Sequence, residues 1–209
     1  MQSINVGKLM KRHILSAAVL SLVVGSALAA SKPLQNIPLK WSPTQTLGDM
    51  GPVDLSGPVL TTRVHIDTFT DSRQNASVVA ENREKPTNIR TVTTSTNVPE
   101  FVTQHMKEIM HGAGVQTVDG ADADIIVSAE VQEFFVTETD QYRGRLKLMV
   151  TARNSQGKEI WSGLIFGGAE NFGRSYKADN YYETLSNMVL RATYNLLANP
   201  GFHQAMQKS

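Results

Sequence analysis

The feature that most constrains the fold is a series of three extended segments in the second half of the chain. Apolar residues alternate with polar ones over residues 125–135 and 146–152, and a third segment follows at 159–169. Such alternation is typical of strands with one buried face, and the short turns between the segments predict an antiparallel meander. In the first segment the alternation places these side chains on the buried face: Ile125, Val127, Ala129, Val131 and Phe135.

A sheet with one buried face needs a covering layer, and two segments can supply it. The sequence Asn97-Val98-Pro99-Glu100 is a typical helix start, and apolar residues then recur at helical spacing until Gly112. A second apolar stripe spans residues 182–197, where we expect the helix to start at the capping sequence 180–183 and to end at 199–201.

The first strand of the core is predicted at residues 61–69, and a short strand at 115–118 precedes the meander. The order is therefore strand, helix, short strand, three-stranded meander, helix. This order predicts an α+β fold, a two-layer sandwich in which a mainly antiparallel sheet is covered by two amphipathic helices.

The first 29 residues have the pattern of an export signal. Lys11-Arg12-His13 precede an uncharged apolar stretch, and Ala27-Leu28-Ala29 matches the small-x-small pattern of a cleavage site. We expect a signal peptide at 1–29, cleaved after Ala29, and a periplasmic protein. The alternative is an uncleaved segment that anchors the chain at the membrane. Met1 and Met10 are both candidate translation starts.

Prolines and glycines punctuate residues 30–60, so this segment is predicted to be an extended leader to a single α+β domain at 61–209. Two interpretations of the leader remain open. One is an edge strand at Pro38–Pro43 whose Trp41 packs on the domain, and the other is a disordered tether. Residues 71–96 form a polar connection that is either mobile or carries a short strand at 89–93.

Composition excludes several classes of function. The chain has no cysteine, which excludes disulfides, thiolate metal sites and cysteine nucleophiles. Lys8, Lys11 and Arg12 lie in the predicted signal peptide, so the mature chain has 17 basic residues against 19 acidic ones and a net charge near −2. No run of basic residues remains, and we predict no nucleic-acid partner. We also predict no metal and no cofactor, because the sequence contains no motif that would hold either.

The stretch VHIDTFTDSR, residues 64–73, is the strongest candidate for chemistry. His65 and Asp67 are two residues apart and would share one face of a strand, whereas Asp71 and Arg73 follow where the strand ends. Catalysis would need an oriented base next to a nucleophile or a metal, and no motif for either occurs in the sequence. We therefore predict that Asp67, Asp71 and Arg73 hold the strand exit or contact a partner.

Other polar clusters are weaker candidates. Asp119, Asp122 and Asp124 lie in one loop, but their spacing does not match that of a calcium loop. The histidines do not converge in sequence. The segment 138–145 is expected to be a charged hairpin tip, with Tyr142 and Arg143 as candidate partner contacts. Four tyrosines surround the last helix and could line a ligand groove: Tyr176, Tyr181, Tyr182 and Tyr194.

Several of these segments resemble the YajG-type family of bacterial envelope lipoproteins. More distantly, the chain is similar to auxiliary lipoproteins of envelope transport systems and to the CsgG-like periplasmic fold. The similarity covers nearly the whole mature chain. It is carried by residues 37–44, the strand exit Phe69-x-Asp71-x-Arg73, and residues 123–128, 150–154 and 202–204. The resemblance implies an envelope location and an α+β fold, and it implies no catalytic residue.

The chain departs from this family at the lipidation site. Such lipoproteins carry Leu-Ala-Gly-Cys, whose cysteine is acylated, whereas this chain reads Leu28-Ala29-Ala30-Ser31. A serine cannot form the thioether. We therefore expect either a soluble periplasmic relative or a protein held peripherally at the membrane by its uncleaved N-terminal segment.

Together these observations predict a non-enzymatic accessory protein of the bacterial envelope that binds a protein or another envelope component. Two other hypotheses remain open. One is an envelope-acting hydrolase that uses His65 with Asp67 or Asp71, and it requires these side chains to converge on a pocket. The other is a small-ligand carrier, and it requires an enclosed pocket between the last helix and the sheet. The sequence does not predict the oligomeric state.

Overall fold

The computed structural model describes residues 33–53, 55–173 and 175–207. The predicted signal peptide, its cleavage site and the two candidate start methionines lie outside the described residues.

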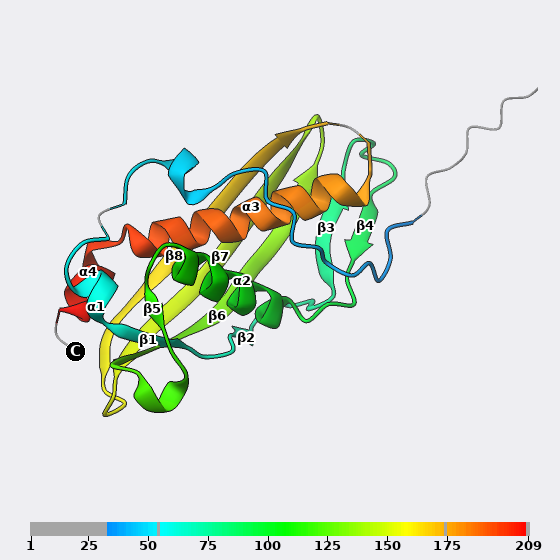
Figure 1. Ribbon diagram of the computed structural model, residues 1–209. Helices are drawn as coiled ribbons and strands as arrows, with labels where there is room; N and C mark the ends of the chain where they lie inside the picture. Colours follow the sequence, from blue (N-terminus) through cyan, green and yellow to red (C-terminus); the bar gives the residue numbers. More distant parts are fainter. Residues whose placement is uncertain (1–32, 54, 174, 208–209) are drawn as a thin grey trace, which may run out of the picture. The chain divides into compact units, whose positions relative to one another are not determined.

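Among the described residues, eight strands form one sheet (Figure 1). Three long strands make the predicted antiparallel meander: β6 (Ile125–Glu138), β7 (Gln141–Asn154) and β8 (Glu159–Phe172). The short strands lie beyond the other edge of β6. There β1 (Arg63–Ile66), β2 (Thr70–Asp71) and β3 (Val78–Asn82) pair with β6 in parallel.

Two further strands complete the sheet. β4 (Arg90–Thr93) pairs with β3 in an antiparallel hairpin, and β5 (Gln116–Thr117) pairs with β1 in parallel. The sheet is thus mostly antiparallel, with parallel pairs beside β6. The segment 71–96, predicted to be a mobile connection or to hold one short strand, contains the β3–β4 hairpin.

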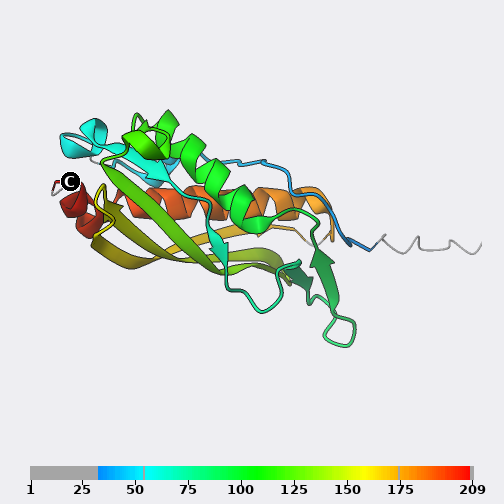
Figure 2. The same ribbon diagram turned by 90° about the horizontal axis from the view of Figure 1, so that it is seen from below.

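Two helices lie on one face of the sheet, α2 (Val98–Gly112) and α3 (Ala178–Leu197). Figures 1 and 2 show both on the same side, so the predicted two-layer α+β sandwich is confirmed. The α2 start is as predicted, because the Asn97 side chain accepts a hydrogen bond from the Glu100 backbone N–H. The predicted start of α3 is wrong. This helix begins before Asn180, whose side chain donates to the Ser175 hydroxyl at 2.8 Å instead of capping.

The core lies between the two helices and the sheet, and a β-bulge decides which phenylalanine of β6 enters it. The β6–β7 register shifts between Val131 and Glu133. An added residue reverses the alternation beyond it. Phe134 is therefore buried, at 1% exposure, whereas Phe135 lies on the other face and is only partly buried. The prediction that Phe135 enters the core is wrong for this reason.

The leader runs along the domain in the part that the structure describes. Ile37 forms a parallel bridge with Thr94, next to β4. Farther along, the Trp41 ring stacks on His105 of α2 at a centroid distance of 4.1 Å, and the Ser42 N–H donates to Ser186 of α3. Residues 33–45 are therefore held by the helices and β4 and do not form a disordered tether. The alternative of an edge strand at Pro38–Pro43 is also wrong, because the bridge to β4 is made by Ile37 and residues 38–43 are not a strand.

Short helical elements complete the chain: η1 (Leu47–Met50), α1 (Pro58–Thr61), η2 (Gly120–Asp122) and α4 (Pro200–Met206). The sequence Asn199-Pro200-Gly201 was expected to end the last helix, and it does separate two helices. The Asn199 side chain caps α4, which buries Phe202 against the ring of Trp161. In the described part of the chain, no helix combines the length and the apolar character that crossing a membrane requires.

Candidate functional site

His65 and Asp67 lie at the end of β1 and make contact with each other. The His65 Nε2 atom lies 3.2 Å from Asp67 Oδ1, and its Nδ1 atom lies 3.0 Å from the Val118 carbonyl oxygen. Both ring nitrogens thus face oxygen acceptors. The nearby hydroxyl of Ser128, on β6, accepts a hydrogen bond from Arg153. This arrangement leaves His65 without a free nitrogen that could act as a base toward that hydroxyl.

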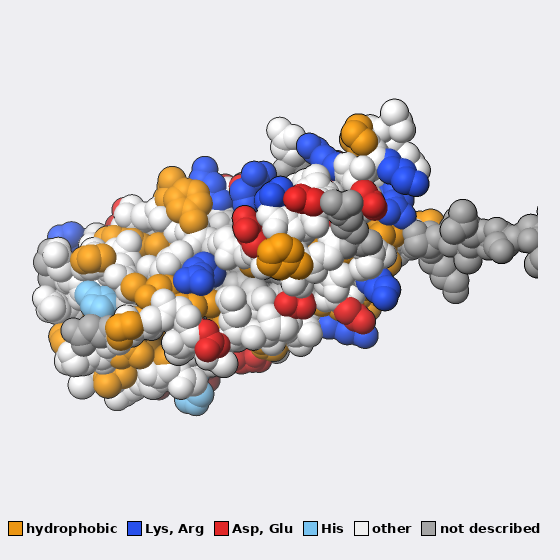
Figure 3. All heavy atoms as spheres, turned by 90° about the horizontal axis from the view of Figure 1, so that it is seen from above, with side chains coloured by type: hydrophobic (Ala, Val, Ile, Leu, Met, Phe, Trp, Pro, Cys, Tyr) orange, Lys and Arg blue, Asp and Glu red, His pale blue; other side chains and the backbone are white. Residues whose placement is uncertain are grey.

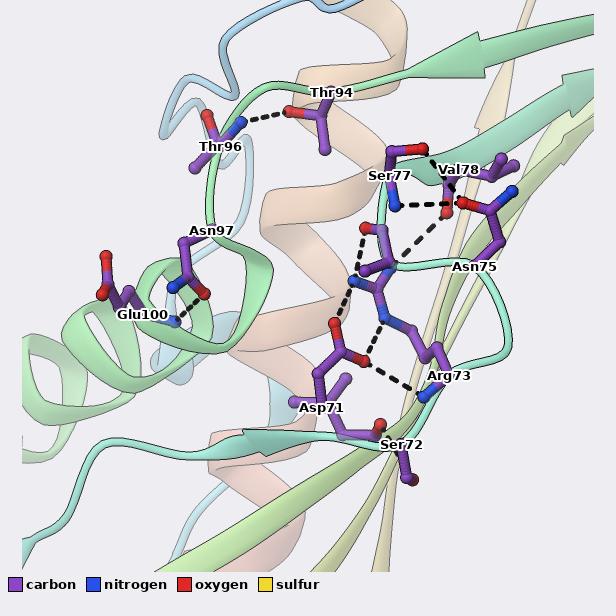
Figure 4. A network of polar contacts seen from close by, with 12 residues as sticks. Asp71, Ser72, Arg73, Asn75, Ser77, Val78, Thr94, Thr96, Asn97 and Glu100 are labelled. Atoms are coloured by element: carbon purple, nitrogen blue, oxygen red, sulfur yellow. Dashed lines mark hydrogen bonds and ion pairs between the residues drawn. The ribbon is translucent and has the colours of Figure 1, made fainter.

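Asp71 and Arg73 form the centre of a polar network where β2 ends (Figure 4). The guanidinium of Arg73 donates to both carboxylate oxygens of Asp71, at 2.7 and 2.9 Å, and to the Ala76 carbonyl oxygen at 2.7 Å. The Arg73 side chain is only 6% exposed. Burial raises the pKa of Asp71, but the hydrogen bonds from Arg73 lower it by more, so the pKa lies below its ordinary value. Through these bonds Arg73 links the end of β2 to the turn that leads from β2 to β3.

A groove of about 610 Å³ lies next to this network, between β2 and the connection from β4 to α2. Its polar side chains are neutral apart from that of Asp71, which Arg73 holds. Thr70, Ser77 and Ser95 are exposed in it. The Ser77 hydroxyl donates to the Asn75 side chain and the Thr70 hydroxyl to the Ala129 carbonyl oxygen, so these two offer a ligand their oxygen atoms as acceptors. The described residues that line the groove are Phe69, Thr70, Asp71, Ala76, Ser77, Thr94, Ser95, Thr96, Asn97, Val98 and Pro99.

The aspartates of the 119–124 loop do not gather into a cation site. Asp124 forms a two-pronged pair with Arg63, with oxygen–nitrogen distances of 2.7 and 3.1 Å. Hydrogen bonds from the Arg63 side chain and backbone lower the pKa of Asp124 to about 2. Within the described residues, no three histidine, aspartate or glutamate side chains come close enough to hold a metal ion.

Two of the tyrosines near α3 contact a buried carboxylate that sequence reasoning missed. Glu138, the last residue of β6, is fully buried; it accepts hydrogen bonds from the Tyr181 hydroxyl and, at 3.0 Å, from the Tyr176 backbone N–H. Burial and the bond to Glu138 raise the pKa of Tyr181. The rings of Tyr142 and Tyr181 pack edge to face at 5.0 Å. Tyr176, Tyr181 and Tyr182 are buried and build core instead of lining a ligand groove, whereas Tyr194 is partly buried. The alternation pattern could have revealed Glu138 only with the β6 bulge taken into account, because the bulge moves Glu138 from the outer to the buried face of the strand.

The candidate contacts of the β6–β7 hairpin separate into one buried and one exposed residue. Tyr142 is fully buried, and its hydroxyl contacts Ser175 and Asn180, so the prediction that it contacts a partner is wrong. The hairpin tip consists of Thr139 and Asp140 alone. Arg143, whose side chain is 50% exposed, lies on the outer face of the sheet near Asp140 and Glu170.

No protein-family description matches the sequence, and no curated protein matches it. Solved structures do resemble it. Protein XCC0632 from Xanthomonas campestris, of the DUF330 family, has a TM-score of 0.53 at 10% identity, over 84% of this chain and 95% of that one. A putative lipoprotein from Caulobacter crescentus CB15 has a TM-score of 0.41 at 9% identity, over 62% of this chain and 89% of that one.

A minor lipoprotein from Acinetobacter baumannii has a TM-score of 0.36 at 11% identity, over 66% of this chain and 94% of that one. At these identities a likeness concerns the fold and not the activity. The chain has the fold of the Xanthomonas campestris protein, and the fold is one found in bacteria.

Proposed function

We propose that this chain is a non-enzymatic accessory protein of the bacterial cell envelope, related to the YajG-type proteins, which binds an envelope protein or another envelope component through the groove beside β2. One observation carries the proposal. The groove offers neutral hydroxyl groups for hydrogen bonding, and its one carboxylate is already neutralised by Arg73. Such a surface can bind a polar ligand, but it has no free acid or base to catalyse a reaction.

The location follows from the sequence of the N-terminal segment. A basic start, an apolar stretch of 16 residues and the sequence Ala27-Leu28-Ala29 support export. Because Ser31 stands where lipoproteins carry cysteine, we place the protein in the periplasm without a lipid anchor, with peripheral attachment by an uncleaved N-terminal segment as the alternative.

The geometry around His65 favours binding over hydrolysis. A hydrolase would need the imidazole to abstract a proton from a nucleophile or a water molecule. The two ring nitrogens instead face Asp67 and the Val118 carbonyl oxygen. Asp71, the other acid in the hydrolase hypothesis, is paired with Arg73.

The test uses two exposed serines, one in the groove and one far from it in sequence. Ser95 lines the groove, whereas Ser155 lies in the turn between β7 and β8. We expect Ser95→Arg to lower the recovery of a specific envelope component at least about tenfold in a quantitative pull-down, because a long cation would fill the groove. Ser155→Arg is the matched control and should leave recovery unchanged. Equal recovery with all three proteins would contradict the proposal.

A further inference from the structure

The long strand β8 has an unpaired edge. In the described part of the chain β8 pairs with β7 alone, so its other side is open along 14 residues. The Asn195 side chain donates to the Phe166 carbonyl oxygen at 2.7 Å, which shows that the backbone groups of Phe166 point toward the open edge. Because these groups alternate along a strand, the even-numbered neighbours of Phe166 point the same way. Soluble proteins seldom leave such an edge long and unprotected.

Large apolar side chains stand on the outer face of the sheet along this edge. Leu164 is 42% exposed, Phe166 is 54% exposed and Phe172 is 89% exposed. Figure 3 shows hydrophobic side chains next to Lys and Arg side chains along the upper rim of the molecule. Exposed apolar groups gathered on one strand indicate a contact surface.

Gly168 lies between these side chains, and packing within the domain does not explain it. A Cβ atom at the neighbouring Gly167 would overlap the Met188 carbonyl oxygen, so Gly167 must be glycine. A Cβ atom at Gly168 would meet open space, and its backbone is not in the left-handed region. Glycine inside a strand weakens it, and it often marks a place where another chain comes close.

We propose that β8 pairs with β8 of a second copy of this chain, antiparallel about a twofold axis at Phe166. In this register the two Phe166 side chains face each other, and Leu164 of each copy lies opposite Gly168 of the other. The dip over Gly168 is then filled by the Leu164 side chain of the other copy.

Charge selects this register over its neighbours. Glu170 is the only charged residue between 162 and 170, and in this register it lies opposite Ser162. Moving the axis by one residue toward the C-terminus places Glu170 opposite Leu164, and moving it by two places Glu170 opposite Phe166. Both moves put a carboxylate beside an apolar side chain. Moving the axis the other way places Ser162 opposite Gly168 and leaves the dip open.

Pairing also explains the contact of Asn195 with the edge. In the free domain its amide occupies the Phe166 carbonyl oxygen, which would otherwise face water. In the dimer the Phe166 N–H of the second copy takes that place, and the Asn195 side chain turns away. The exchange replaces one exposed hydrogen bond with part of a continuous ladder across two sheets.

Cysteine crosslinking tests the register, since the chain has no cysteine of its own. Residues opposite each other in such a ladder have Cα atoms about 5.5 Å apart, within the range that a disulfide spans. We expect mild oxidation to crosslink Phe166→Cys with itself. A mixture of Leu164→Cys and Gly168→Cys proteins should give a mixed dimer, and either protein alone should give little. Ile89→Cys, at an equally exposed position on the β3–β4 hairpin, is the control and should form no disulfide-linked dimer.

Light scattering on the purified protein provides a second readout. The wild type should have twice the mass of one chain, and Phe166→Asp should raise the dissociation constant at least about tenfold, because two carboxylates would face each other. Ile89→Asp and Ser95→Arg should leave the dimer unchanged, which separates this proposal from partner binding at the groove. A wild type that stays monomeric, together with no mixed disulfide between the Leu164→Cys and Gly168→Cys proteins, would overturn the proposal even if the protein binds an envelope component.

Discussion

Removing one hydroxyl group beside Glu138 tests how the core tolerates its buried carboxylate. In Tyr181→Phe the ring still packs on Tyr142, but the carboxylate loses one hydrogen-bond donor. A hydrogen bond to a charged group contributes about 1.5–3 kcal/mol, so we expect the free energy of unfolding to fall by about 2 kcal/mol. Tyr194→Phe is the matched control, because Tyr194 is only partly buried, and removal of its hydroxyl should change stability by less than about 0.5 kcal/mol.

The same variant has a predicted pH dependence. Burial raises the pKa of Glu138, but hydrogen bonds led by that from Tyr181 lower it by more, to below its ordinary value of 4.5. A carboxyl group whose pKa is lower in the folded than in the unfolded protein stabilises the fold at pH values above its unfolded-state pKa. This stability is lost as the pH falls through the folded-state pKa. Without the Tyr181 hydroxyl the folded-state pKa of Glu138 rises toward the unfolded-state value, so the variant should lose less stability on acidification than the wild type, and that loss should be complete at a higher pH.

Urea unfolding at neutral and mildly acidic pH measures both effects. If Tyr181→Phe and Tyr194→Phe have the same unfolding free energy at each pH, the bond to Glu138 does not stabilise the fold, and the reasoning is refuted.

Three further predictions concern other parts of the chain. Gly167→Ala should lower the free energy of unfolding by about 2 kcal/mol or more, because its Cβ atom would overlap the Met188 carbonyl oxygen. Gly168→Ala should be neutral or slightly stabilising, and urea titrations that rank the two variants equally would contradict this. Trp41→Ala should release the leader from α2 at a cost of about 2 kcal/mol. The Ser42 and Thr44 amides, which donate to α3, should then lose hydrogen-exchange protection, whereas slow exchange at both would show that the stacked ring does not hold the leader. The Asp124 carboxyl should titrate near pH 2 by NMR, since Arg63 stabilises its charged form, and any stability from this pair should be lost only as the pH falls toward that value. A midpoint near the ordinary value would show that the pair does not persist in solution.

The elements that carry the fold were predictable because each has a local signal. Alternation gave the β6–β8 meander, and the Asn97 cap with the following apolar stripe gave α2. Other features depend on contacts between distant segments. The start of α3 was misassigned because Asn180 finds a partner in Ser175 and Tyr142, which no capping pattern reveals. The β3–β4 hairpin is held by pairing with β6 and by the leader, and its sequence is too polar to predict it by itself.

The candidate site shows the same division. The proximity of Asp71 to Arg73 follows from their two-residue spacing, and the structure adds that Arg73 also ties down the turn through the Ala76 carbonyl oxygen. The groove beside them was not predictable, because it is formed by β2 together with a segment more than 20 residues later. Glu138 was missed for a different reason: a single bulged residue in β6 turns a position that reads as exposed into a buried one.

The central claim is that the groove beside β2 contacts an envelope component in the cell. A photo-crosslinking amino acid placed at position 95, in the groove, tests it most directly, with position 155 as the reference. We predict that illumination of intact cells gives a discrete crosslinked product from position 95 and none from position 155. Identical patterns from the two positions, or no product from either, would contradict the claim.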